Sequence, residues 1–182
     1  GVTAQGFELT FGVNHLGPYL FTRLLIPHLK PNARIINLGS KAHYRAKGFD
    51  WPALERSTAT LTGLREYERS KLANHLFTRA LIRRLPSEKA WVYTVHPGVV
   101  ASDIWRRVPQ PFRWLMMRNM ITNEEGAEGP LLLTTANAEN GAYYSRTKPK
   151  DPNPVSLDET LQDELWSRSA RWTGVPNELY SD

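Results

Sequence analysis

The sequence predicts an α/β fold in which helices pack on a mostly parallel sheet. Helical and extended patterns alternate along its 182 residues, which is the order expected of βα units. The extended segments are compact and β-rich, as buried strands are. One of them is closed abruptly by a Pro-Gly pair, which ends a strand. No internal repeat or low-complexity tract interrupts the alternation.

The spacing of the apolar residues places the individual elements. It predicts a long helix from about residue 7 to 29 and a second amphipathic helix over 65–81. Three β-rich runs are predicted as strands: ARIINLGS at 33–40, WVYTVHPG at 91–98 and GAYYSR from 141. A strand therefore follows each of the first two helices.

Two further helices are predicted from capping-box spacing, in which a Ser or Thr lies three residues before a Glu. Thr122 and Glu125 have this spacing before a helix predicted to run towards Asn137. Ser156 and Glu159 repeat it before a C-terminal helix. Both helices are therefore predicted to begin at these caps.

Length and composition predict one domain spanning residues 1–182. The length lies within the usual ~100–200 residues of a domain, and 41% of the residues are hydrophobic, so a sizeable core can form. The proline-rich stretch KPKDPNPVS at 148–156 is predicted as a stiff loop rather than a linker, because too little chain follows it to build another core.

Charge and hydropathy argue against several classes of function. The net charge of +5 comes from basic residues that are scattered rather than gathered, so no nucleic-acid interface is predicted. No apolar run approaches the ~20 residues of a membrane span, and no signal-peptide pattern is found. We therefore expect a cytoplasmic location, with peripheral membrane association as the alternative.

No metal site is predicted. Cysteine is absent, which excludes disulfides, thiolate ligands and a cysteine nucleophile. His15, His43 and His96 do not have the spacing of metal ligands, so we expect them to pack or to end strands.

The stretch REYERSKLANHLFTRAL at 65–81 places Tyr67 one turn before Lys71. Residues four apart on a helix share a face, so the two side chains can act on one small region. A free phenol titrates near ~10, and a neighbouring ammonium stabilises its ionised form. The pair can therefore act as an acid/base unit at neutral pH. Taken alone, it also fits an amphipathic tyrosine beside a solvated lysine.

Ser40 is a second candidate, in the stretch INLGSKAH. It lies where the first predicted strand ends, and this is the edge at which α/β sheets usually hold ligands. A hydroxyl there can donate to a substrate carbonyl. The serine thus gives the Tyr67–Lys71 pair a chemical context.

These residues resemble the signature of the short-chain dehydrogenase/reductases, a serine after an N-x-[GS] strand end and a later Y-x-x-x-K. The stretches FGVNHLG, RIINLGSKAH, YERSKLANHLFTRAL and VHPGVV, in this order, are similar to the retinol-dehydrogenase-like branch. The resemblance implies a doubly wound, Rossmann-like parallel sheet with flanking helices and an NAD(P)-dependent oxidoreductase. It also implies NADP as cofactor, with NAD as the alternative, a lipophilic alcohol or carbonyl as substrate, and a homo-oligomer.

The resemblance further implies roles for individual residues. Tyr67 matches the general acid/base, Lys71 the residue that favours the phenolate and holds the cofactor ribose, and Ser40 the donor to the substrate carbonyl. Asn14 matches a fourth catalytic residue, whose backbone carbonyl holds a water leading to the lysine. Pro18 lacks the N–H that would bond this carbonyl in a helix, so we expect the carbonyl to be free. A tolerated helix kink is the alternative.

A candidate cofactor loop follows the second predicted strand. Pro97, Gly98, Val100 and Ser102 resemble the family's loop over the nicotinamide, with backbone groups on the carboxamide and the Ser102 hydroxyl towards the cofactor. A simple turn and cap is the alternative interpretation of PGVVAS.

The segment DIWRRVPQPFRWLMMRNM at 103–120 lies where the family binds substrate. Its tryptophans, methionines and arginines suit an adaptable apolar lid. A membrane-surface helix and plain core packing are the alternatives.

One family feature is missing. The T-G-x-x-x-G-x-G loop that approaches the cofactor pyrophosphate has no counterpart in the sequence, nor has the NNAG strand. We therefore expect the chain to correspond to roughly the C-terminal two-thirds of a family member, with the N-terminal strands absent.

Besides an oxidoreductase, a truncated and non-catalytic interaction module that pairs through the helices at Phe7 and Arg65 stays open. A sugar-nucleotide epimerase also uses Y-x-x-x-K, but the KLAN context and the short C-terminal region favour the dehydrogenase.

Overall fold

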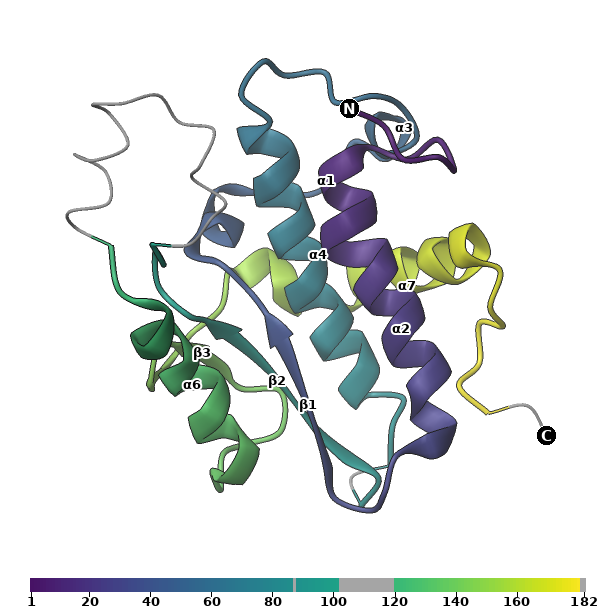
Figure 1. Ribbon diagram of the computed structural model, residues 1–182. Coiled ribbons are helices and arrows are strands. Elements are labelled where there is room, and N and C mark those ends of the chain that lie inside the picture. Colours follow the sequence, from purple (N-terminus) through teal and green to yellow (C-terminus); the bar gives the residue numbers. More distant parts are fainter. Residues whose placement is uncertain (87, 102–119, 181–182) are drawn as a thin grey trace.

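A computed structural model describes residues 1–86, 88–101 and 120–180. Its centre is a four-stranded sheet in the order β1-β2-β3-β4 (Figure 1). The strands are β1 (Ala33–Leu38), β2 (Ala90–His96), β3 (Tyr143–Ser145) and β4 (Lys148–Lys150). β1 pairs with β2 and β2 with β3 in parallel, which confirms the three predicted strands and the mostly parallel sheet.

The fourth strand was not foreseen, since the sequence predicted only a stiff loop there. β4 pairs antiparallel with β3, after a turn in which Arg146 adopts a left-handed φ of 57°. Pro149 cannot donate to a ladder, but it lies on the strand at the end of the sheet order, where prolines are tolerated. The sheet is therefore mostly parallel, with one antiparallel strand at this edge.

The register brings the carboxyl ends of β1 and β2 to the same edge of the sheet. The two strands are aligned from Ala33 opposite Ala90 to Leu38 opposite Val95. One residue further, Gly39 N–H donates to the Val95 carbonyl at 2.8 Å. The segments that follow, Ser40 after β1 and Pro97 after β2, consequently start at the edge where an α/β sheet holds ligands.

The helical elements agree with the predicted ones in position. Before the sheet come α1 (Leu9–Phe11), a π-helical turn (Gly12–Leu16), α2 (Gly17–Leu25) and a 3-10 turn (Ile26–His28). Between β1 and β2 lie a 3-10 turn (Lys41–Arg45), α3 (Trp51–Leu54) and α4 (Leu64–Ile82). After β2 come α6 (Asn123–Thr135), a 3-10 turn (Pro154–Leu157) and α7 (Glu159–Thr173). None of the described helices is long and apolar enough to cross a membrane.

The two predicted caps have different outcomes. Thr122 forms the capping box with Glu125 at the start of α6, as predicted. Ser156 does not cap α7, because its hydroxyl donates to the Asn153 carbonyl at 2.6 Å. Asp158 caps α7 instead, accepting from Leu161 N–H at 3.1 Å. The C-terminal helix is therefore confirmed and its predicted cap is wrong.

Helices cover both faces of the sheet. Along β2, Val92 packs in the cluster that contains α2, α4 and α7, while Tyr93 packs on the other face against Leu133 of α6. This alternation follows from the two-residue period of a strand. Figure 1 shows α6 on one side of the strands and α2, α4 and α7 on the other.

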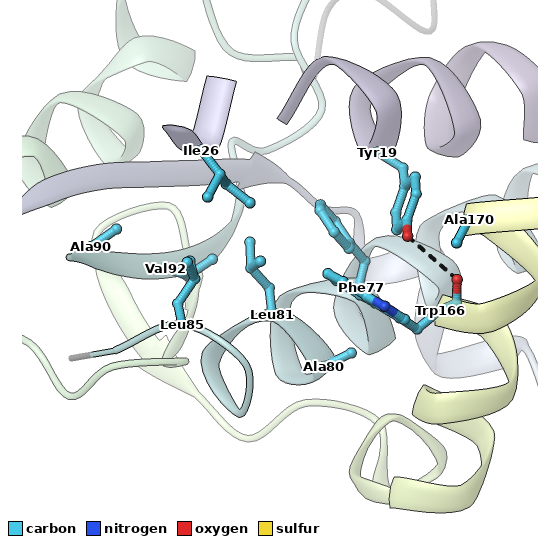
Figure 2. Packing of buried hydrophobic residues seen from close by; sticks show 10 residues of the cluster. All are labelled: Tyr19, Ile26, Phe77, Ala80, Leu81, Leu85, Ala90, Val92, Trp166 and Ala170. Atoms are coloured by element: carbon cyan, nitrogen blue, oxygen red, sulfur yellow. Dashed lines mark hydrogen bonds between the residues drawn. The ribbon is translucent and has the colours of Figure 1, made fainter. Parts of the chain in front are cut away.

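The largest cluster fixes α4 in place (Figure 2). Phe77 of α4 packs against Tyr19 of α2 and Trp166 of α7, and the Tyr19 hydroxyl donates to the Trp166 carbonyl at 3.4 Å. Leu81 of α4 is buried in the same cluster. Burying one such side chain contributes about 1.5–3 kcal/mol. The helix that carries Tyr67 and Lys71 is therefore anchored over its C-terminal half.

Candidate active site

Helix α4 presents Tyr67 and Lys71 one turn apart, as predicted. The Lys71 ammonium lies 5.7 Å from the centroid of the Tyr67 ring. Its Nζ donates to the carbonyl oxygen of Leu38, the last residue of β1, at 3.1 Å. Burial disfavours the charged form and lowers the pKa of Lys71. The ammonium is thus held between the tyrosine ring and the carboxyl end of β1.

Asn74 completes this anchorage and was not singled out from the sequence. Its Nδ2 donates to the same Leu38 carbonyl at 3.2 Å. Asn74 lies three residues after Lys71 on α4, so helical spacing puts both side chains on one face. That spacing in SKLAN is the signal that could have found it.

Ser40 lies two residues beyond Leu38 and caps the 3-10 turn Lys41–Arg45. Its Oγ accepts from Ala42 N–H at 3.2 Å, and the side chain is buried. Within the described residues no group accepts the hydroxyl hydrogen of Ser40, which leaves it available as a donor. Gly39 allows the close approach of this segment to β2, because a Cβ there would lie 2.7 Å from Thr94 Cγ2.

Asn14 is joined to α4 through a buried serine. The Asn14 amide donates to Ser70 Oγ at 3.1 Å, and the Ser70 hydroxyl donates to the Tyr67 carbonyl at 2.8 Å. Ser70 is 0% exposed and was not predicted as a site residue. Asn14 is therefore coupled to the turn of α4 that begins at Tyr67.

The backbone around Asn14 forms a π-helical turn, which the sequence analysis did not anticipate. Gly17 N–H donates to the Gly12 carbonyl, a bond that spans five residues instead of the four of an α-helix. Pro18 follows at once and has no N–H with which to bond the Asn14 carbonyl in an α-helical turn. Such π-helical turns inside α-helices frequently mark functional sites.

The predicted cofactor loop starts where β2 ends and packs against the segment before α6. Gly98 has a φ of 108°, and a Cβ there would lie 2.5 Å from Ile121 Cδ1. Val100 forms a parallel bridge with Ile121, and Ala101 N–H donates to the Ile121 carbonyl at 2.9 Å. Ser102 and residues 103–119 of the predicted lid lie outside the described residues.

The three histidines singled out from the sequence are buried, in agreement with their expected packing. His43 stacks on His75, with ring centroids 3.7 Å apart and an angle of 13° between the planes. Burial lowers the pKa of His15 and of His96 to about 4 each and lowers that of His43. All three side chains are therefore neutral at pH 7.

The structure thus gathers the predicted catalytic residues around one end of the sheet. Lys71 bonds to the end of β1, Ser40 follows that end by two residues, and Asn14 is tied through Ser70 to the turn of Tyr67. The loop from Pro97 begins at the neighbouring strand end. An acid/base pair, a hydroxyl donor and a loop with a required glycine can serve a carbonyl or alcohol substrate beside a cofactor.

Comparison with known proteins shows what this chain is similar to. Human retinol dehydrogenase 13 is 36% identical over 95% of this chain, which spans 56% of that protein. Human dehydrogenase/reductase SDR family member 13 is 34% identical over 96% of the chain, which spans 49% of it. Nearly the whole chain is thus similar to members of the short-chain dehydrogenase/reductase family. It spans about half the length of the curated relatives it matches. No family model matches it.

Solved structures show the same fold as this chain. The crystal structure of an uncharacterized protein from Mycobacterium paratuberculosis superposes over 100% of the chain with a TM-score of 0.75, at 25% identity, and 63% of that protein is covered. The carbonyl reductase from chicken fatty liver, solved with NADPH bound, gives a TM-score of 0.50 over 74% of the chain and 52% of its own length, at 20% identity. The Rossmann-like, doubly wound fold class is thereby confirmed.

Proposed function

We propose that this chain forms, as one domain over residues 1–182, the catalytic part of an NAD(P)-dependent oxidoreductase that interconverts a lipophilic alcohol and its carbonyl. The observation that carries the proposal is the Lys71 ammonium, held between the Tyr67 ring and the Leu38 carbonyl two residues before Ser40. The names of the matched retinol dehydrogenases support the substrate class.

The proposed reaction moves one proton and one hydride. When bound, the nicotinamide cofactor supplies the carbon that takes up or releases the hydride. During oxidation Tyr67 receives the hydroxyl proton of the alcohol as its carbinol hydride leaves, and during reduction Tyr67 returns the proton to the carbonyl oxygen. Ser40 donates its free hydroxyl hydrogen to that oxygen and orients the substrate.

Lys71 and Asn14 support Tyr67 in this scheme. The Lys71 ammonium lies 5.7 Å from the centroid of the Tyr67 ring, and it can donate to ribose hydroxyls because an ammonium has three donors. Asn14 holds the turn of Tyr67 through Ser70, and we propose that its backbone carbonyl orders a water that returns protons to the lysine.

The residues after β2 fit the nicotinamide end of such a cofactor. Gly98 combines a φ of 108° with a neighbour 2.5 Å from where its Cβ would be, so no larger residue suits this tight turn. We assign the backbone of Pro97, Gly98 and Val100 to the carboxamide, and the Ser102 hydroxyl to the cofactor. NADP is the expected form, with NAD as the alternative.

The lid and the assembly are parts of the same proposal. Residues 103–120 combine aromatic residues, methionines and arginines, and we assign them to the apolar wall of the substrate site. Peripheral contact of this segment with a membrane is the alternative assignment. A homo-oligomer that pairs through the faces of α2 and α4 is proposed for the complete protein.

Titration of NADPH and NADH, followed by nicotinamide fluorescence, tests the function. The 182-residue chain is compared with the same chain preceded by the N-terminal segment of a matched retinol dehydrogenase. We expect the extended chain to bind NADPH and to oxidise or reduce a lipophilic substrate. If neither chain bound either nucleotide, the oxidoreductase proposal would be abandoned.

An exposed groove beside β1 favours a second candidate, an interaction module. Among the described strands β1 pairs only with β2, so its other edge is open. A groove of about 470 Å³ runs along this edge. Its lining is largely apolar, with Phe21 and Ile36 among its residues, and it also includes Asn14 and Lys71. Open strand edges recruit strands of other chains. Light scattering distinguishes the candidates, because concentration-dependent association without nucleotide binding would favour the module.

A further inference from the structure

We propose that His43 is a positioning residue that fixes the Ser40 hydroxyl for donation, using both of its ring nitrogens. The proposal rests on the proposed function, because it assigns His43 a part in the same reaction. The His43 side chain is 0% exposed, so it cannot touch a substrate.

The bonds of the ring settle which nitrogen carries the hydrogen. His43 Nε2 lies 3.1 Å from the backbone nitrogen of Asn153, and an amide N–H can only donate. Nε2 must therefore accept, and in a neutral imidazole the hydrogen then lies on Nδ1. Nδ1 is 2.6 Å from the Ser40 carbonyl oxygen, to which it donates.

This donation shapes the turn that carries the candidate hydroxyl. The Ser40 carbonyl accepts from both the backbone N–H of His43, at 3.1 Å, and its Nδ1–H. The Ser40 Oγ meanwhile accepts from Ala42 N–H at 3.2 Å. With its carbonyl and one lone pair of the hydroxyl both engaged, Ser40 keeps its O–H free for donation.

Asn153 holds the other end of this connection. Its Nδ2 donates to the carbonyls of His43 and Ala46, at 2.7 and 2.9 Å, and its Oδ1 accepts from Val155 N–H at 3.0 Å. Asn153 is 5% exposed, and its side-chain hydrogen-bonding groups are engaged. A loop more than 100 residues away in sequence therefore sets the tautomer of His43.

The surroundings keep His43 neutral and in one rotamer. The ring stacks on His75 and meets the Tyr143 ring edge-on at 5.1 Å, with Tyr44 on its other side. Burial is the main cause that lowers its pKa. Further titratable groups near the stacked histidines include Lys41, Lys71, Arg79 and His96. Burial and the positive charges of Arg79 and Lys71 lower the pKa of His75, the ring on which His43 stacks. A second proton on His43 would face the Asn153 N–H and break that bond.

Two amide substitutions separate the two bonds. In His43→Asn the amide nitrogen can replace Nδ1 as the donor to Ser40, while in His43→Gln the amide oxygen can replace Nε2 as the acceptor from Asn153. In the full-length enzyme we expect His43→Gln to lower kcat roughly 10- to 100-fold, with the cofactor KM unchanged, because a small misplacement of a positioned group costs this much. His43→Asn should retain most of kcat.

A double-mutant cycle tests whether His43 acts through Ser40. If it does, His43→Gln should have little further effect on kcat in a Ser40→Ala background, because the group it positions is gone. An equal loss of kcat in both backgrounds, or equal losses for His43→Asn and His43→Gln, would overturn the proposal.

Nuclear magnetic resonance gives a readout that does not need turnover. Imidazole ¹⁵N shifts of His43 should report the Nδ1–H tautomer, and amide exchange at Ala42 should quicken in His43→Gln but not in His43→Asn. The Nε2–H tautomer, or unchanged exchange in His43→Gln, would reject the proposal even in an inactive protein. A protein with the expected shifts but no activity would instead reject only the proposed function.

Discussion

The side-chain amide of Asn14 donates to Ser70 Oγ across 3.1 Å, and this bond joins the π-helical turn to α4. Ser70 passes the connection on to the Tyr67 carbonyl. The buried Ser70 hydroxyl, 56 positions from Asn14, thereby links Asn14 to Tyr67. The consequence is that a residue outside the predicted catalytic set connects two of its members.

Replacing Ser70 by Ala should therefore destabilise the protein and disturb the site. The partly buried Asn14 amide would lose its acceptor, and a hydrogen bond of this kind contributes about 0.5–1.5 kcal/mol. Urea unfolding of Ser70→Ala and of the exposed control Ser167→Ala measures the difference. Equal free energies of unfolding for the two variants would show that this connection is not stabilising.

The Tyr67→Phe substitution tests the acid/base assignment. Removing the hydroxyl should lower kcat by about 10²–10⁴-fold, the usual contribution of a positioned proton donor. Cofactor affinity should change little, because the ring and its cation contact with Lys71 remain. Tyr180→Phe is the matched control, because Tyr180 is 48% exposed near the C-terminal end. Unaltered turnover in Tyr67→Phe would remove this residue from the mechanism.

The sequence was informative where local pattern decides the structure. The strands β1 to β3 and the helix α4 follow from apolar spacing, and the Tyr67–Lys71 juxtaposition follows from helical geometry alone. The capping box of Thr122 is likewise local, since its partner is three residues away. These features need no tertiary contact to be specified.

Two features escaped prediction although their contacts are local. β4 pairs with β3 across a short turn, with Tyr144 opposite Pro149, and Ser156 bonds to Asn153, three residues away, while Asp158 caps α7. A third contact lies beyond any local pattern. The bond between Asn153 and His43 spans 110 residues. No spacing rule connects such positions, so only the folded chain reveals them.

Acid should destabilise the protein, and His15 makes the effect measurable. His15 is fully buried, and burial lowers its pKa from the usual 6.5 to about 4. The unfolded state therefore binds more protons between these values, so the stabilisation is complete above pH 6.5 and is lost as pH falls towards 4. The difference between the two pKa values corresponds to roughly 3 kcal/mol for this residue.

Urea unfolding at pH 7 and at pH 4.5 measures this loss. His15→Phe should lose less stability on acidification than the wild type, since the pocket around His15 is formed by the aromatic rings of Phe11, Tyr19 and Phe77. His28→Gln, at an exposed position, should follow the wild type. The same acid sensitivity in His15→Phe as in the wild type would assign the effect to other groups.

The Pro18→Ala substitution asks whether the π-helical turn serves the site. Alanine would supply an N–H that can bond the Asn14 carbonyl and so favour a regular α-helical turn. Because Pro18 is exposed, the free energy of unfolding should change by less than about 1 kcal/mol. The value of kcat should fall, by less than roughly tenfold. Pro130→Ala, inside α6, is the matched control and should leave kcat unchanged. A kcat equal to that of the wild type would make Pro18 only a tolerated residue, because the carbonyl of Asn14 would then need no freedom from helical bonding.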